Sequence, residues 1–148
     1  MSGLPSRLSP WPVVAVGAIV WKEDRILLIR RGRPPRQGQW SIPGGRQEAG
    51  ETIQQAARRE IREEAGIEID ILDIAAVVDL IDRDDGELRH HYTVIDMLAE
   101  WRSGEAVAGD DALEVAWLRE SELAGLGLPD LQRQVIAEAA RKRRARAA

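Results

Sequence analysis

The sequence predicts an α/β protein in which a mixed β-sheet is packed between helices, as an α/β/α sandwich. Two segments, 52–65 and 130–144, carry apolar residues at helical spacing. Short runs rich in Val and Ile, bounded by Gly, Pro and Asp, precede the first of these segments and separate the two. Strands that alternate with helices are typical of a sheet covered by helices. A chain of 148 residues, 44% of them hydrophobic, suits one domain with one core.

Composition and charge exclude several classes of function. The chain has no Cys, which excludes a disulfide, a thiolate nucleophile and a Cys-type zinc site. Residues 141–146 hold five basic residues and no acid, whereas residues 1–140 hold 16 basic and 25 acidic residues and carry a formal charge of −9. An acidic body argues against nucleic acid as a partner.

The N-terminal half predicts a loose arm followed by two strands. Residues 1–12 contain three prolines and little pattern, so the single domain is expected over 13–140, with a basic tail at 141–148 that frays. The apolar run 13–21 predicts a buried strand, which turns at Glu23 and Asp24 into a second strand at 26–30. The run is too short to span a bilayer and lacks a cleavage site, so we expect a cytoplasmic protein without membrane contact.

Residues 31–39 form a polar loop with three arginines, two prolines and two glycines. It is either a solvated connection or a phosphate-binding loop, in which case Arg33 and Arg36 bind the substrate. Trp40 follows and either stacks on a base or packs beneath the loop. Pro43, Gly44 and Gly45 then predict a turn that leads into the first helix.

The helix at 52–65 changes character halfway along. At about 100° per residue, Ile53, Ala56 and Ala57 share a face with Glu60 and Glu64, and Glu63 lies beside them. Clustered buried carboxylates repel one another and are costly unless they are paired or bound to metal. A solvated acidic face with i,i+4 pairs is the alternative. The continuation of the apolar stripe favours a site for a hard cation such as Mg²⁺, which takes oxygen ligands.

Residues 45–67 resemble the Nudix box. Every fixed position of that motif is matched. Five residues separate Gly45 from Glu51, and seven more separate Glu51 from the run REIREEAGI at 59–67. The resemblance implies a Nudix-type α/β/α fold. It also implies a Mg²⁺- or Mn²⁺-dependent hydrolase that cleaves a nucleoside diphosphate linked to another group.

Residue roles follow from the same resemblance. It implies that Glu60, Glu63 and Glu64 are metal ligands, joined by a main-chain carbonyl of Gly44 or Gly45. It also implies a structural ion pair between Glu51 and Arg59. Such a pair braces the glycine turn against the helix, as groups that orient metal ligands do.

The C-terminal half predicts a hairpin, a strand and a helix. Residues 68–82 and 88–101 read as strands, in one long piece or two for the first, joined by a turn at 84–86. His90 and His91 face opposite sides of a regular strand, so a two-His metal site is not expected. Tyr92 is a candidate for contact with a base. The chain then continues with a loop at 102–111, a strand at 113–118 and a short helical turn at 121–123. It ends in a helix whose buried stripe is Leu131, Val135, Ile136 and Ala139.

The resemblance also implies that an acid from a loop after the box assists the metal or positions the attacking water. The loop at 102–111 is either the source of that acid or an ordinary polar turn. We expect the turn at 109–111 to reach the sheet edge where the first helix begins, which ranks Asp110 and Asp111 above Glu105 and Glu114. The candidate catalytic carboxylates are therefore Glu63, Glu64, Asp110 and Asp111, with the general base being Glu63 or a loop acid.

The predicted reaction is attack by water at phosphorus, with Mg²⁺ or Mn²⁺ neutralising the pyrophosphate and acidifying the water. The substrate is a small-molecule nucleotide, either a nucleoside triphosphate, normal or damaged, or ADP-ribose. A Nudix-fold regulator that binds a nucleotide without cleaving it, and a plain metal-binding scaffold, are the alternatives. The sequence leaves open whether the protein is a monomer or a homodimer.

Overall fold

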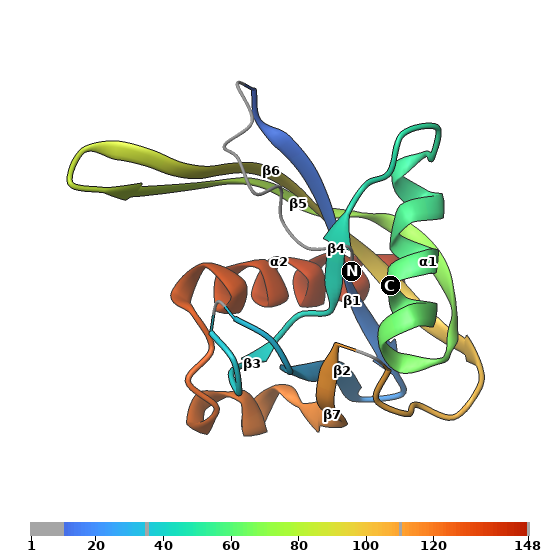
Figure 1. Ribbon diagram of the computed structural model, residues 1–148. Helices are drawn as coiled ribbons and strands as arrows, with labels where there is room; N and C mark the ends of the chain where they lie inside the picture. The colour runs from blue at the N-terminus through green and yellow to red at the C-terminus, as the bar shows by residue number, and fades with distance from the viewer. Residues whose placement is uncertain (1–10, 35, 110, 148) are drawn as a thin grey trace.

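A seven-stranded mixed sheet forms the centre of the computed structural model, as far as the described residues 11–34, 36–109 and 111–147 show (Figure 1). The predicted arm at 1–12 lies outside the described residues except for Trp11 and Pro12, and Asp110 lies outside them entirely. The strands are β1 Val13–Lys22, β2 Arg25–Arg31, β3 Trp40–Ser41, β4 Gly44–Arg46, β5 Glu68–Asp84, β6 Glu87–Ser103 and β7 Ala112–Arg119.

Strand β1 is central because it pairs with three other strands. It runs parallel to β6, with Gly17 opposite Asp96, and antiparallel to β2 at its C-terminal end. Its N-terminal half pairs antiparallel with β4, which sets Gly17 opposite Gly44. The path through the sheet is β3-β2-β1-β6-β5, and β7 pairs with β2. The predicted mixed sheet is confirmed.

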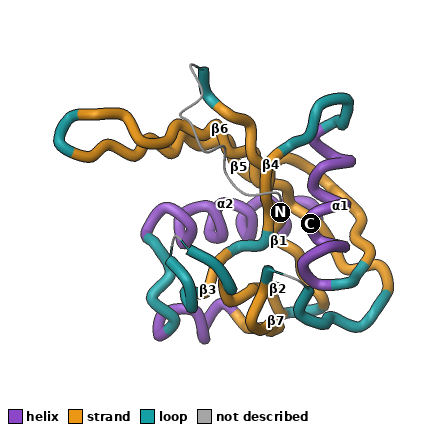
Figure 2. The backbone as a smooth tube through the Cα atoms, in the orientation of Figure 1, coloured by secondary structure: helices purple, strands orange, loops and turns teal. Residues whose placement is uncertain are grey.

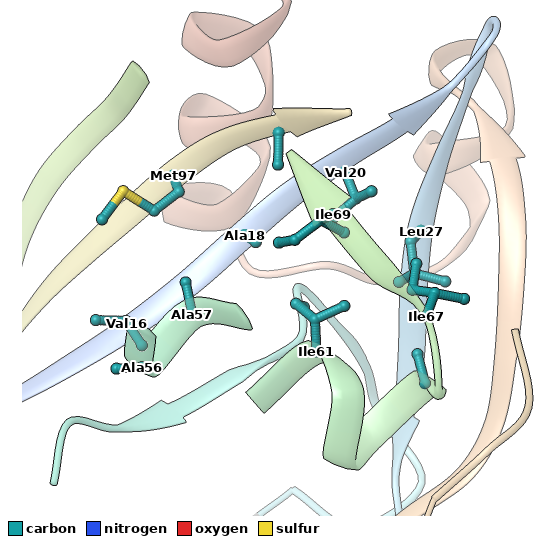
Figure 3. Close-up of a cluster of buried hydrophobic side chains, with 12 residues drawn as sticks. Val16, Ala18, Val20, Leu27, Ala56, Ala57, Ile61, Ile67, Ile69 and Met97 are labelled. Atoms are coloured by element: carbon teal, nitrogen blue, oxygen red, sulfur yellow. The ribbon is translucent and has the colours of Figure 1, made fainter. Parts of the chain in front are cut away.

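Helix α1 (Ile53–Ala65) and helix α2 (Asp130–Ala147) cover opposite faces of the sheet. Alternation along β1 supplies both interfaces: Val16, Ala18 and Val20 pack with α1, while Ile19 and Trp21 pack with α2. Figure 3 shows the first of these clusters between α1 and the strands, with Ala56, Ala57 and Ile61 contributed by the helix. The α/β/α arrangement expected from the sequence is therefore present.

The hairpin of β5 and β6 extends beyond the body of the molecule (Figure 2). Asp85 and Gly86 turn the chain with φ of 52° and 79°, as the predicted hairpin requires. Strand β5 is a single strand of 17 residues. A 3₁₀ helix, Glu120–Gly125, follows β7 and replaces the shorter helical turn expected there.

Two expectations about local structure are wrong. Residues 44–46 are strand β4 and not simply a turn, because β1 offers them a free edge with which to pair. The basic segment does not fray, since α2 continues to Ala147 and Arg143 donates to Glu100 on β6 at 2.7 Å. Among the described residues, no helix is long and apolar enough to cross a membrane.

Candidate active site

Helix α1 begins and ends at the residues that its local sequence selects. The Thr52 hydroxyl accepts a hydrogen bond from the Gln55 N–H at 3.1 Å, and the Gln55 side chain accepts one from the Thr52 N–H at 2.9 Å. This reciprocal capping box satisfies two donors at the helix start. Gly66 ends the helix with φ of 70°, and its N–H donates to the Arg62 carbonyl. The two caps fix which face of the helix lies against the sheet.

Two carboxylates on that face are buried. Glu60 is 1% exposed and Glu64 is 6% exposed. The Gly44 N–H donates to Glu64 Oε2 at 3.0 Å. Gly45 lies directly against Glu60, since a Cβ added at Gly45 would be 2.5 Å from the carboxyl carbon of Glu60. Strand β4 thus brings the two glycines against the two acids.

Burial changes the acidity of both groups. It raises the pKa of Glu64 to about 8, and the nearby charge of Glu60 contributes to the same shift. Burial also raises the pKa of Glu60, although Arg59 opposes that shift. Glu60 Oε2 is buried and accepts no hydrogen bond from any described residue. These two side chains therefore lie where a positive charge would be strongly favoured.

Arg59 connects the helix to the loop that precedes it. Its Nε and Nη2 donate to the two carboxylate oxygens of Glu51 at 2.6 and 2.9 Å, which is a bidentate pair. Its Nη1 donates to Glu60 Oε1 at 2.9 Å, and Nη2 also donates to the Arg46 carbonyl at 2.9 Å. The structure thus brings Glu51 and Arg59 together and adds a contact with Glu60 that the sequence did not predict.

Glu63 is placed differently from the other two acids of the helix. Its side chain is 49% exposed, and its Oε2 lies 3.3 Å from Arg59 Nη1. The part of the chain that the structure describes contains no group of three acidic or histidine side chains positioned to hold a metal ion. Of the three predicted ligands on this helix, Glu60 and Glu64 are buried, whereas the Glu63 side chain is about half exposed.

Residues 104–109 of the loop pack at the opposite end of α1 from the one expected. The Val107 N–H donates to the Ala65 carbonyl, and the Gly109 N–H donates to the Glu64 carbonyl, both at 2.9 Å. The expectation that this loop reaches the start of the helix is therefore wrong. The last carbonyls of a helix lack partners within it, and this loop supplies their donors.

The three candidate acids of that region that the structure describes have separate environments. Asp111 pairs with Arg33 at 2.7 Å, and Glu114 pairs with Arg30 at 2.8 Å. Glu105 is exposed. Asp110 lies outside the described residues, so its candidate role stays a prediction.

The predicted substrate-binding residues lie in three places. Arg33 contacts Asp111, and Arg36 is exposed in the loop after β2 with φ of 62°. Tyr92 is half-buried on β6, where burial raises its pKa, and its ring stacks on His90 at 6.0 Å. Trp40 packs against the core cluster on the α2 side, in agreement with the packing alternative.

One buried acid, Asp96, was not predicted from the sequence. This residue is 6% exposed on β6, within an apolar run, and burial raises the pKa of its carboxyl to about 6. Gly17 lies beside it: a Cβ there would be 2.4 Å from Asp96 Oδ1. A single acid inside an otherwise apolar strand was the signal that could have identified it.

The residues present fit a hard divalent cation. Carboxylate oxygens are the ligands that Mg²⁺ and Mn²⁺ prefer. Glu60 has a buried oxygen without a hydrogen bond from the described residues, and the pKa of Glu64 is raised to about 8. A cation at these oxygens would offset both the desolvation and the mutual repulsion of the two acids.

Comparison with known proteins adds a family and several relatives. The family model described as NUDIX domain matches residues 11–139. An ADP-ribose pyrophosphatase of Methanocaldococcus jannaschii is 38% identical over 120 residues, which is 81% of this chain and 69% of that protein. The Mycobacterium tuberculosis protein named "Putative 8-oxo-dGTP diphosphatase 2" is 35% identical over 130 residues, 87% of this chain and 88% of that protein.

Among solved structures, the MutT NUDIX hydrolase of Burkholderia pseudomallei is similar in both fold and sequence. Its TM-score is 0.76 and its sequence is 33% identical, with 86% of this chain and 98% of that chain covered.

Proposed function

This chain belongs to the Nudix family of hydrolases, and from that membership we propose that it cleaves the pyrophosphate linkage of a nucleoside diphosphate joined to another group. The observation that carries the proposal is the pair of buried carboxylates, Glu60 and Glu64, held against Gly44 and Gly45. Such an arrangement is costly in a protein without a cation to neutralise it.

The reaction uses Glu60, Glu63 and Glu64 to hold Mg²⁺ or Mn²⁺, with the main-chain carbonyl of Gly45 as a further ligand. The cation, when bound, supplies charge neutralisation at the pyrophosphate and acidifies a water molecule. Arg59 keeps Glu60 and the loop that carries Glu51 in fixed relative positions. Positioning and electrostatic stabilisation then provide most of the rate.

The general base is a carboxylate that is free to take a proton. Glu63 is exposed near the buried acids, and its contact with Arg59 at 3.3 Å is longer than the 2.7 Å contact of Asp111 with Arg33, which supports Glu63 as the base. Asp111 is paired with Arg33 and belongs to a loop that packs on the C-terminal end of α1. We therefore rank Glu63 above Asp111 and assign Asp111 the role of orienting Arg33, which binds a phosphate together with Arg36.

Two substrate classes have support from the comparisons. ADP-ribose is supported by the relative from M. jannaschii, and a damaged nucleoside triphosphate by the relative from M. tuberculosis. Both share a nucleoside, a pyrophosphate linkage and a second group. The alternative of a regulator without catalysis is not favoured, because these relatives carry the names of hydrolases and this chain keeps every acid of the motif.

The test is a product-release assay over a nucleotide panel that contains ADP-ribose, 8-oxo-dGTP and unmodified triphosphates. Each is incubated with Mg²⁺ or Mn²⁺, and then with EDTA. We expect release of a nucleoside monophosphate from at least one compound, with loss of release in EDTA. Turnover that persists in EDTA, or no turnover of any compound, would contradict the proposal.

A further inference from the structure

Asp96 is a buried carboxyl for which the proposed reaction has no use. It is 6% exposed, and its side chain forms no hydrogen bond or ion pair with a described residue. Its neighbours along β6 are Ile95 and Met97, so it lies within an apolar strand. A carboxyl that is almost completely covered and has no partner among the described residues points to a ligand that would supply one.

Asp96 lies close to the glycines that contact the catalytic acids. In the sheet register, Gly17 on β1 is opposite both Asp96 on β6 and Gly44 on β4. A Cβ at Gly17 would be 2.4 Å from Asp96 Oδ1 and 3.3 Å from the Pro43 carbonyl oxygen. Gly17 alone therefore separates Asp96 from Gly44, whose N–H donates to Glu64.

The Asp96 side chain is on the face of the sheet that α2 covers, whereas Glu60 and Glu64 are on the α1 face. Ile95 and Met97 pack with the α1 cluster and Leu98 packs with the α2 cluster, which places Asp96 on the α2 side. Strand β4 has only three residues and, among the described strands, pairs only with β1. A nucleotide with its pyrophosphate at α1 would therefore have to pass around β4 to bring its base to Asp96.

On that face, the residues that extend from Asp96 toward the N-terminal end of β6 form a half-buried surface. Val94 and Tyr92 come next on β6, and Ala15 and Val13 lie opposite them on β1. Alternate residues of a strand are about 7 Å apart, so this surface gives a planar base a place to lie with one edge at the carboxyl. Tyr92 ends the surface with an aromatic ring.

We propose that Asp96 selects the base of the substrate by accepting a hydrogen bond from an exocyclic amino group, so that the ligand is a nucleotide of adenine, guanine or cytosine. The inference rests on the proposed function only in taking the ligand to be a nucleotide. A base without an amino group leaves the carboxyl unpaired in the complex, and a site built in this way rejects such an analogue.

The experiment compares nucleotides that differ only in an amino group. GTP and ITP differ at the 2-position, and ADP-ribose is compared with its analogue carrying unsubstituted purine. The ratio of kcat/KM within each pair is measured for the wild-type chain, Asp96→Leu, Asp96→Asn and the control Asp70→Asn. Asp70 is an exposed carboxylate on β5.

We expect the wild-type chain and the control to prefer the amino-bearing compound of the hydrolysed pair by about tenfold or more. Asp96→Leu removes the acceptor and should reduce that preference to within about twofold, while Asp96→Asn keeps an oxygen acceptor and most of the preference. Melting temperatures establish folding, and Asp96→Ala replaces the Leu variant if the latter does not fold.

A wild-type preference that survives in Asp96→Leu would overturn the role of Asp96 and leave the hydrolase proposal intact. Equal losses for both compounds would also overturn it, since they indicate a structural role. If the wild-type chain hydrolyses none of the four compounds, calorimetric dissociation constants for the same pairs test Asp96 by the same criterion, and the nucleotide panel described above decides the hydrolase proposal separately. Absence of binding to all four compounds would overturn the role of Asp96.

Discussion

Replacing Arg59 by Ala removes one side chain that several acids share. The guanidinium pairs with Glu51 at 2.6 Å and with Glu60 at 2.9 Å, and it is 19% exposed. The Glu60 side chain is only 1% exposed, so the substitution leaves a buried carboxylate without its cation. Loss of one partner from a buried pair typically costs 3–5 kcal/mol. We expect a value near the lower limit, about 3 kcal/mol, because Arg59 retains some contact with water.

Thermal and urea denaturation measure this effect. A loss of about 3 kcal/mol corresponds to a fall in Tm of roughly 6–12 °C for a chain of this size. The matched control is Arg62→Ala, three residues along the same helix. Arg62 pairs with the exposed Glu68 at 3.0 Å, and such surface pairs contribute about 0–1 kcal/mol. Equal melting temperatures for the two variants would refute the role given to Arg59.

Three further outcomes follow from the buried acids. Glu64→Gln should lower kcat by roughly 10²-fold or more in initial-rate assays, and near-wild-type rates would remove Glu64 from the site. Folding raises the pKa of Glu64 from 4.5 to about 8. The protonated side chain therefore contributes its full stabilisation of the folded state below pH 4.5, and this contribution is lost as the pH rises to 8. In EDTA, urea titrations should therefore show a larger loss between pH 5 and pH 8 for the wild-type chain than for Glu64→Gln, and equal losses would contradict the shift. Gly45→Ala should displace the Glu60 carboxylate, 2.5 Å from the new Cβ, and reduce turnover, whereas Gly125→Ala, with nothing within 4 Å, should leave turnover unchanged.

Local signals made the first helix and the long hairpin predictable. Thr52 and Gly66 cap α1 through contacts within four residues of the chain, so the sequence alone contains that information. Asp85 and Gly86 likewise select their own turn. The burial of Glu60 and Glu64 was also expected, because they continue the apolar stripe of the helix.

The remaining features depend on contacts between distant segments. Residues 44–46 become a strand only because β1 diverges from β2 and pairs with them. Residues 104–109 pack on the C-terminal end of α1 because Gly109 has no side chain, and a Cβ there would be 1.9 Å from the Glu63 carbonyl oxygen. Asp96 is similar, since its environment is created by Gly17 on another strand. Spacing along one segment contains no information about such neighbours.

The central claim is that the acids of α1 hold a divalent cation, and Mn²⁺ binding followed by electron paramagnetic resonance tests it most directly. The wild-type chain, Glu60→Gln, Glu64→Gln and the control Glu68→Gln, an exposed acid just beyond the helix, are titrated without substrate. We predict that the wild-type chain and the control bind Mn²⁺ and that both helix variants bind it at least about tenfold more weakly, because each loses a charged oxygen ligand. Mn²⁺ affinity that is the same in all four proteins would contradict the account.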